Sequence, residues 1–387
     1  MKLSRKTWLQ LSTTALIRTV LNTGFRMVFP FQPILMEGFG ISLARISRMY
    51  AGQSLVGLLS PFLASVADTR GRKTGMLTGL VIFSLGVLVV LLVPTPLGFF
   101  FFLVLSMLGK SIFDPSLQAY FGDNIPYSRR GFVMGILEMS WSLSFFLGMP
   151  LIGFVLSRFG LLEPFLVLAV LSLASILVVL GLIPPDGVPR ASGETVLSKL
   201  KGVLRTGPAL AGLVVMTLIC LSNQLVNVVF GVWLNSSFGM QIAALGGASA
   251  LIGLAELLGE SGVSVLADRL NKQRAVLIGL GGSILASILL PLIGEAVWGA
   301  YLGLFAFYLT FEFTIVSLIP LMTGVLPQAR GTVMALTIAS ANLGRGLGSL
   351  AAAPMYSGGF WVNALSAALV NLLAIVCLRY VIVQEEG

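Results

Sequence analysis

The sequence predicts an all-α polytopic membrane protein in which twelve transmembrane helices form two pseudo-symmetric six-helix bundles. The first observation is composition, because 57% of the 387 residues are hydrophobic and the mean hydropathy is +0.99. A soluble domain needs more polar residues at its surface, whereas a bilayer accepts apolar ones. The second observation is a series of apolar runs of about 20 residues, which is the length that crosses a bilayer. The third is a pattern of short motifs that recurs 200 residues later.

Apolar runs long enough to span a bilayer follow one another along the whole chain. Pro and Gly residues mark the breaks between them, as at Pro94 and Pro96 and at Pro184 and Pro185. The predicted spans are residues 8–34, 44–66, 74–94, 97–120, 131–157, 163–183, 208–234, 242–266, 275–294, 298–323, 331–356 and 360–382.

The longest connection, between the sixth and seventh spans, divides the chain. It predicts a first bundle in residues 1–183, a cytoplasmic linker in 184–207 and a second bundle in 208–387. Five apolar residues of the linker share one helical face: Val196, Leu197, Leu200, Val203 and Leu204. A short amphipathic helix is therefore expected, either on the inner membrane surface or as a solvated linker.

The distribution of charge predicts the orientation and excludes some classes of protein. The formal net charge is +9, but most Lys and Arg residues fall in the short loops on one side of the predicted spans. The positive-inside rule places these loops and both termini in the cytoplasm of a multi-pass protein of the plasma membrane, here a bacterial inner membrane. The basic balance thus reflects the lipid bilayer, and no nucleic-acid partner is expected.

Residue types argue against an enzyme. The chain has no histidine, and its two cysteines, Cys220 and Cys377, lie inside apolar runs where they are expected to pack. No Ser–His pair, metal-ligand set or Gly-rich phosphate loop occurs. We therefore expect no catalytic residues, no metal and no cofactor, and a monomeric protein.

The two halves repeat each other. Asp68 lies 200 residues before Asp268, and Arg130-Gly131-x-Val133-Met134 matches Arg330-Gly331-x-Val333-Met334 at the same offset. Two coincidences at one offset, each at the same place in its half, indicate duplicated six-helix units.

The charged loop between the second and third predicted spans carries a resemblance to a known family. Residues 64–73 read A-S-V-A-D-T-R-G-R-K, and this is similar to the G-x-x-x-D-R-x-G-R-R loop of the major facilitator superfamily. The chain keeps the acid, the glycine and the last two bases. The second copy keeps Asp268, Arg269 and Lys272 but has Asn271 in place of the glycine. The resemblance covers the whole chain and implies the fold of that superfamily.

Two further motifs narrow the resemblance. The end of the first span, Gly24-x5-Pro30-x2-Pro33, looks like the signature of twelve-helix drug:proton antiporters and sugar-efflux permeases. The fifth span carries Gly148-x-Pro150-x2-Gly153, which is similar to the antiporter motif of those exporters. The arginine expected in the fourth span of that branch aligns with Leu105, although Lys110 lies nearby. This departure puts the exporter assignment in doubt.

The loop charges predict a gate. Asp68, at the end of the second span, can face the partially positive N-terminus of the eleventh span near Gly331, and the neighbouring bases can pair with Asp123. Such contacts hold the two halves together on the cytoplasmic side; the alternative is that the bases only fix topology. The predicted gating residues are Asp68, Arg70, Gly71, Arg72, Asp123, Arg130, Asp268, Arg269 and Arg330.

Charged residues inside spans require a reason, because each costs about 2.5–3.5 kcal/mol at the bilayer centre. They are Arg18, Arg26, Lys110, Asp114, Glu138, Glu256, Glu260, Glu312 and Arg345. The third, sixth, ninth and twelfth spans have none away from their ends, as lipid-facing spans require. The other spans are expected to enclose a polar cavity.

One helical stripe points to the substrate. Arg18, Asn22 and Arg26 recur every four residues and suit an anionic or hydrogen-bonding substrate. Alternatively, carboxylates of facing helices pair with both arginines, and Trp141 is either a cavity wall or helix packing. The predicted substrate-binding residues are Arg18, Asn22, Arg26, Lys110, Trp141, Asn227, Glu312 and Arg345.

Without histidine, a proton carrier must be a carboxylate, whose neutral form is favoured by burial. Asp114, Glu138 and Glu312 are the predicted proton-coupling residues, with static ion pairs as the alternative. Glu256 and Glu260, one turn apart, are expected to include a partner for the eleventh span.

These features predict a secondary active transporter that moves a small organic molecule by alternating access, favouring efflux in exchange for protons. The second hypothesis is proton-coupled uptake of an organic anion. A third is a lipid flippase or a non-transporting accessory protein on the same fold, which needs a lateral opening and an apolar cavity wall.

Overall fold

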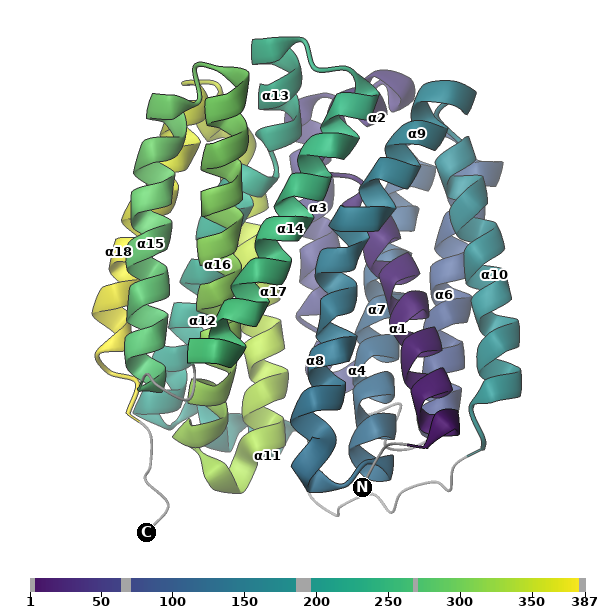
Figure 1. The fold of residues 1–387 in the computed structure, drawn as a ribbon, viewed down its shortest axis with the longest axis vertical. Helices are drawn as coiled ribbons and strands as arrows, with labels where there is room; N and C mark the ends of the chain where they lie inside the picture. The colour runs from purple at the N-terminus through teal and green to yellow at the C-terminus, as the bar shows by residue number, and fades with distance from the viewer. Residues whose placement is uncertain (1–3, 64–70, 186–195, 267–270, 383–387) are drawn as a thin grey trace.

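The computed structural model describes residues 4–63, 71–185, 196–266 and 271–382, and within these ranges every element is helical. The helices run up and down, roughly along the long axis of the molecule (Figure 1). In the first half they are α1 Arg5–Arg26, α2 Gln32–Phe39, α3 Leu43–Gly57, α4 Ser60–Leu63, α6 Arg72–Leu92, α7 Pro96–Asn124, α8 Tyr127–Leu143, η1 Ser144–Gly148, α9 Met149–Phe159 and α10 Glu163–Leu182. Then follow α11 Val196–Leu204, α12 Gly207–Asn227, α13 Phe230–Phe238, α14 Ile242–Leu266, α15 Lys272–Ile293, α16 Val297–Val325, η2 Pro327–Ala329, α17 Arg330–Tyr356 and α18 Phe360–Leu378.

These elements form twelve spans, several of which are broken. The first predicted span, 8–34, is two helices, because Pro30 has no N–H to donate and α2 begins anew with Pro33 in its first turn. It also continues beyond the predicted end, to a left-handed cap at Gly40, whose φ is 62°. The seventh span is likewise split, into α12 and α13. The chain therefore turns irregularly at the same place in both halves.

Nine helical segments within the described ranges are long and apolar enough to cross a membrane by composition alone. The remaining spans are α1–α2, α3–α4 and α17. The first and last of these carry charged residues in mid-length, and α3 is only 15 residues long. Spans with polar faces must be shielded by other helices, and this places them inside the molecule.

The helices pack as two groups of six spans. In the first group α6 packs on α7 and α10, and in the second α15 packs on α16 and α18. The groups meet where α3 contacts α17 and where η1 and α9 contact α14. The most exposed spans, α10, α15 and α18, show large apolar side chains such as Leu177, Leu292 and Leu369 on the outside. These are charge-free spans, so the periphery is suited to lipid.

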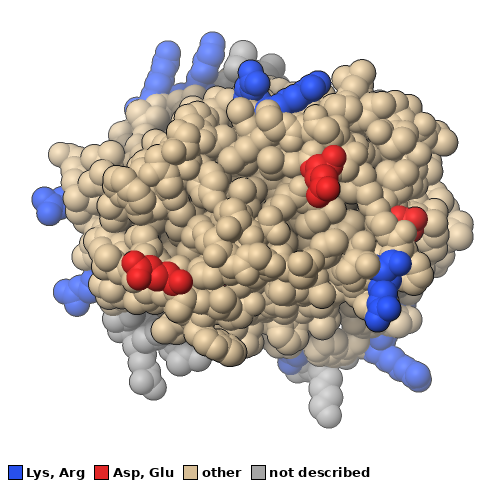
Figure 2. Space-filling model, turned by 90° about the horizontal axis from the view of Figure 1, so that it is seen from above, with Lys and Arg blue, Asp and Glu red and all other residues tan. Residues whose placement is uncertain are grey.

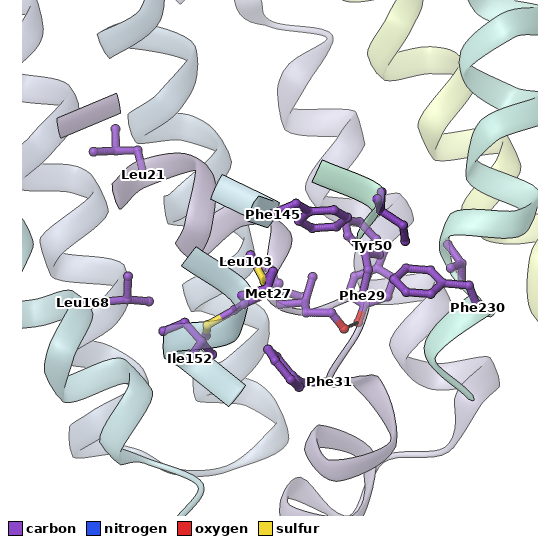
Figure 3. Packing of buried hydrophobic residues seen from close by; sticks show 14 of the residues in the cluster. Leu21, Met27, Phe29, Phe31, Tyr50, Leu103, Phe145, Ile152, Leu168 and Phe230 are labelled. Carbon is purple, nitrogen blue, oxygen red and sulfur yellow. Dashed lines mark hydrogen bonds between the residues drawn. The ribbon is translucent and has the colours of Figure 1, made fainter. Parts of the chain in front are cut away.

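Buried apolar and aromatic residues of both halves form one continuous cluster. Figure 3 shows Phe29, Tyr50 and Phe230 side by side, with Phe230 contributed by the second half. The Phe29 and Tyr50 rings are 5.2 Å apart, and the Tyr50 hydroxyl donates to the carbonyl oxygen of Val28 at 3.0 Å. Across the two halves, Gly231 of the second half lies against the carbonyl oxygens of Phe29 and Pro30.

The linker contains the short helix α11, and part of its apolar face lies against other helices. Leu200 and Val203 are buried, and α11 contacts α12 and α17. Val203 belongs to a second apolar cluster with Leu213 and Val381. Leu200 and Val203 of the amphipathic face thus pack on the second group of helices, whereas Leu204 of the same face is exposed.

Candidate functional site

The charges inside the spans form two groups, and the first lies entirely within the first half. Arg18 donates from Nε to Asp114 Oδ1 at 3.1 Å and from Nη2 to Glu138 Oε2 at 3.1 Å. Lys110 Nζ lies 2.6 Å from Asp114 Oδ2 and also donates to Asn22 Oδ1. We call Arg18, Asn22, Lys110, Asp114 and Glu138 the Arg18 cluster. It contains two bases and two acids, so its formal charges balance.

Neighbouring groups complete the Arg18 cluster. Gln118 donates to Glu138 at 3.0 Å, Asn22 donates to Ser140 at 3.2 Å, and Arg18 donates to the Leu137 carbonyl oxygen at 2.7 Å. Glu138 nevertheless keeps 45% of its side chain exposed. A helix spacing of four residues places Arg18, Asn22 and Arg26 on one face of α1, and this face meets α7 and α8.

The second group is an ion pair that joins the two halves. Arg26 of α1 donates to both carboxylate oxygens of Glu256 of α14, at 2.9 and 2.5 Å. Arg26 is 3% exposed and Glu256 only 1%. A bidentate pair of this kind combines charge with fixed geometry. The sequence analysis expected Glu256 and Glu260 to include a partner for the eleventh span; the side chain that binds Glu256 is Arg26 of α1.

Aromatic rings fix the position of the Arg26 side chain. Its guanidinium carbon lies 4.1 Å from the centre of the Trp141 ring and 3.6 Å from that of Phe145. The π-helical turn η1, Ser144–Gly148, follows directly after α8 and precedes Pro150. Such turns re-aim side chains within a helix. The carbonyl oxygen of Trp141, at this irregular turn, accepts a hydrogen bond from Arg26 at 2.8 Å.

A small cavity lies between the two halves next to the Arg26–Glu256 pair. Its free volume is about 20 Å³, little more than one water molecule needs. The lining residues come from α1, α8, α12, α14, α16 and α17 and from the turn after α1: Phe25, Arg26, Phe29, Trp141, Asn223, Gln224, Asn227, Glu256, Tyr308, Phe311 and Arg345. The halves are therefore drawn closely together around this point.

Polar residues of α12 form a chain along the cavity. Tyr308 donates its hydroxyl to Asn227 Oδ1 at 2.7 Å, Asn227 donates to Gln224 at 3.2 Å, and Gln224 donates to Ser349 at 3.0 Å. These bonds connect α16, α12 and α17. They hold three walls of the cavity in one geometry.

Two acids of the second half lie outside the ion pairs. Glu260, one turn after Glu256, accepts a hydrogen bond from the Ser142 hydroxyl at 2.7 Å. Glu312 of α16 is 6% exposed and, in the part of the chain that the structure describes, has no hydrogen bond or ion pair. Glu312 does not line the cavity; its Cβ packs against Gly259 of α14.

The structure thus separates the predicted substrate-binding residues. Arg26, Trp141, Asn227 and Arg345 line the cavity, whereas Arg18, Asn22 and Lys110 belong to the Arg18 cluster and Glu312 faces α14. Both Arg18 and Arg26 form ion pairs with carboxylates, as the alternative interpretation of these two residues predicted. Sequence reasoning missed Phe25, Phe29, Asn223, Gln224, Tyr308 and Phe311. The only sequence signal was on α12, where the amide residues Asn223 and Asn227 lie one helical turn apart.

The predicted gating residues are only partly described. Arg72 and Asp123 form an ion pair at 3.1 Å, and Gly71, with φ of 91°, precedes α6 in a conformation that favours glycine. Arg130 donates to the Ile125 carbonyl oxygen at 3.1 Å, and Arg330 begins α17. Asp68, Arg70, Asp268 and Arg269 lie outside the described residues.

Glycine contacts bring the two halves to van der Waals distance at several heights. Gly231 of α13 faces the carbonyl oxygens of Phe29 and Pro30, and Gly253 of α14 faces the backbone of η1. Asn342 of α17 donates to the Gly57 carbonyl oxygen of α3 at 3.2 Å. Small residues of this kind allow helix backbones in a membrane to approach closely.

Two bundles of six spans, a closed central cavity and buried charges shared between the bundles define the class: this is a polytopic carrier-type membrane protein. The family model for the Major Facilitator Superfamily matches residues 14–349. The chain belongs to this superfamily, and its fold is the fold of that family.

Relatives of this chain carry transporter names. It is 27% identical over 360 residues to the uncharacterized MFS-type transporter YwfA of Bacillus subtilis, covering 90% of this chain and 86% of the relative. It is 25% identical over 269 residues to the multi-drug resistance efflux pump PmrA homolog of Lactococcus lactis, covering 67% and 66%. The crystal structure of the human organic anion transporter MFSD10 (TETRAN) superposes with a TM-score of 0.76 at 18% identity, over 97% of this chain and all of that one.

Proposed function

We propose that this protein is a secondary active transporter that exports a small organic molecule across the bacterial inner membrane in exchange for protons. Membership of the superfamily supports transport by alternating access of two bundles. A relative named as a multi-drug efflux pump supports the outward direction. The human structural neighbour, named as an organic anion transporter, supports a small organic substrate.

The observation that carries the proposal is the Arg26–Glu256 pair. It is buried, it joins the two bundles, and it borders the cavity. Separating two buried charges leaves each without a partner, and the energetic cost is several kcal/mol unless another charge replaces the partner. Rocking of the bundles therefore requires a substrate or a proton to compensate the pair. Coupling between binding and movement follows from this requirement.

The proton site proposed here is Glu312. Within the described spans the bases are Arg18, Arg26, Lys110 and Arg345, and the acids are Asp114, Glu138, Glu256, Glu260 and Glu312. The acids exceed the bases by one. Asp114 and Glu138 are held by Arg18, and Glu256 by Arg26, which leaves Glu260 and Glu312. Glu260 accepts a hydrogen bond from Ser142, whereas Glu312 is buried and has no hydrogen bond or ion pair among the described residues, so we take Glu312 as the acid that a proton neutralises. Of the three sequence candidates, Glu312 is the one retained as the carrier.

The gate remains part of the proposal. We propose that charged residues near the ends of the spans hold the two bundles together at the end where α1 begins. They are Asp68, Arg70, Arg72, Asp123, Arg130, Asp268, Arg269 and Arg330. Arg72 and Asp123 join α6 to α7 within the first bundle, so we propose that this pair supports the gate without itself reaching the second bundle.

The test of the proposal is transport by the purified protein in proteoliposomes. We expect that an acidic lumen drives accumulation of an exported compound, because protons that leave the lumen exchange for it; a panel of fluorescent and radiolabelled organic ions serves as cargo. Accumulation driven only by an acidic exterior would contradict exchange and indicate co-transport.

Glu312→Gln is predicted to abolish the response to the pH gradient while cargo exchange at equal pH continues, because the amide cannot release a proton. Efflux and counterflow of the same labelled cargo measure the two activities. Glu37→Gln, which changes an exposed acid, is the matched control and should leave both intact. An unchanged pH response in Glu312→Gln would remove Glu312 from the coupling step.

A further inference from the structure

The charges that line the central cavity do not balance. Arg26, Glu256 and Arg345 line it, and Glu256 is bound by Arg26 through both oxygens. In the described residues Arg345 has no carboxylate within ion-pair distance. The cavity wall therefore carries one uncompensated positive charge.

The position of Arg345 favours contact with a ligand over a structural ion pair. It lies in the middle of α17, is partly exposed, and its guanidinium carbon is 5.6 Å from the centre of the Trp141 ring. Arg26 approaches the same ring at 4.1 Å. An arginine inside a span normally finds an acidic partner or faces an aqueous cavity, because its charge is costly in lipid. Arg345 faces the cavity and has no acidic partner among the described residues.

An independent observation comes from Asn223 of α12. It lines the cavity and is 7% exposed, and its Nδ2 group has no hydrogen-bond acceptor among the described residues. A buried donor without an acceptor is unfavourable, because it has lost its hydrogen bonds to water without replacing them. Arg345 and Asn223 are thus two donors at one cavity, and both require an acceptor.

The rest of the wall is aromatic. Phe25, Phe29 and Trp141 come from the first half, and Tyr308 and Phe311 from the second. Such rings bury apolar and aromatic surface well. Polar donors at one place on an aromatic wall are typical of sites that bind amphipathic small molecules.

We infer that the central cavity binds an organic anion with an aromatic or similarly flat apolar body, and that Arg345 and Asn223 hold its carboxylate or sulfonate group. This inference rests on the proposed transport function and names the class of its substrate. The anionic group supplies the missing acceptors and the missing negative charge, while its apolar body lies against Phe29, Trp141 and Phe311. A cationic compound would add a second unpaired positive charge to the same wall. The bundles must separate to admit such a ligand, since the cavity now has room for about one water.

The experiment compares three probes of nearly equal shape: 1-naphthoate, 1-naphthylmethanol and 1-naphthylmethylammonium. Binding to the purified full-length protein in a neutral detergent is measured by titration calorimetry, and thermal stabilisation is measured in parallel. We expect saturable binding of 1-naphthoate at an affinity at least about tenfold above that of the neutral and cationic probes, since a charge-assisted hydrogen bond contributes that much.

Arg345→Gln is expected to weaken 1-naphthoate binding by about 10- to 100-fold, and Arg345→Lys, which keeps the charge, by less. Asn223→Leu should weaken it by a few-fold. Arg158→Gln, which removes an exposed arginine outside the cavity, is the control and should bind as the parent does. The unliganded melting temperature of each variant shows whether it is folded, and Arg345→Lys provides the comparison if Arg345→Gln is not.

Equal or tighter binding of the ammonium probe, no saturable binding of any probe, or unchanged 1-naphthoate affinity in folded Arg345→Gln would each overturn the inference. Transport in proteoliposomes is scored separately. If 1-naphthoate binds through Arg345 but no cargo is moved, the proposed transport function fails while the anion site stands. If cargo is moved and 1-naphthoate does not bind, the reverse holds.

Discussion

At the scale of single residues, the two arginines on one face of α1, Arg18 and Arg26, have different kinds of partner. Arg18 is paired with acids of its own bundle, whereas Arg26 reaches Glu256 across the interface. Both arginines are buried, but only the second pair is affected when the bundles move apart. The same residue type at the same helical spacing therefore makes a contact within one bundle at Arg18 and a contact between the bundles at Arg26.

Arg26→Met is predicted to destabilise the protein strongly, because Glu256 is then buried without a counter-charge. Breaking a buried pair in this way costs about 3–5 kcal/mol. The double variant Arg26→Met/Glu256→Gln should recover part of this loss, because no lone charge remains. Thermal denaturation in detergent measures the effect as a shift of Tm.

The control for this cycle is Arg48→Met, which removes an exposed arginine of α3 and should shift Tm little. A double variant that is no more stable than Arg26→Met would show that the two side chains are not coupled.

At the scale of elements, broken helices shape the centre of the molecule. The breaks between α1 and α2 and between α12 and α13 let the chain turn where the two halves meet. Arg26 binds the Trp141 carbonyl oxygen of α8 and lies over the Phe145 ring of the π-helical turn η1. Irregular backbone in a membrane is tolerated where protein surrounds it. Here it lies in the interface between the two halves.

Gly231→Ala is predicted to loosen this interface. A Cβ at Gly231 would lie 2.5 Å from the Phe29 carbonyl oxygen and 2.7 Å from that of Pro30, so α13 and the turn after α1 must separate. The matched control is Gly247→Ala in α14, where nothing lies within 4 Å and the change should be neutral or stabilising by up to about 1 kcal/mol.

Tm and protease sensitivity of the purified variants measure the difference. Gly231→Ala should have a lower Tm and faster cleavage than Gly247→Ala. Equal behaviour of the two would show that the α13 contact is not a tight closure.

At the scale of the whole molecule, the two ends differ. Seen from the end opposite to the start of α1, most of the surface is formed by uncharged residues, with acidic and basic side chains scattered among them (Figure 2). The sequence assigns only Arg45, Arg48 and Arg158 among the basic residues to the loops and helix ends on this side. The more basic end, at which α1 begins and α18 ends, is expected to face the cytoplasm.

This orientation is predicted to appear in fusions to the C-terminus. A green fluorescent protein fused after residue 387 should fluoresce in cells, and an alkaline phosphatase at the same position should be inactive, because it stays in the cytoplasm. The same reporters placed after residue 240, in the turn between α13 and α14, provide the opposite-side control. The reverse pattern would place both termini outside.

The number and order of the spans could be predicted from the sequence because each needs only its own run of apolar residues. Prediction was weaker where tertiary packing decides the local structure. The amphipathic face of α11 was assigned to membrane or solvent, but Leu200 and Val203 pack on protein, since an apolar face does not specify which apolar surface covers it. Helix breaks were also missed, because the backbone groups left free at Pro30 can be tolerated only where neighbouring helices shield them.

For the site, the sequence determined which residues are out of place in lipid, because hydropathy and the cost of burying charge depend on residue type alone. It thereby determined the membrane class, the two repeated halves and the list of candidate charges. Only the tertiary structure decided how those charges pair: Arg18 with Asp114 and Glu138, Arg26 with Glu256, and Arg345 with no acid among the described residues. The reason is physical, since Coulomb energies and hydrogen bonds depend on distances between helices that are far apart in the chain.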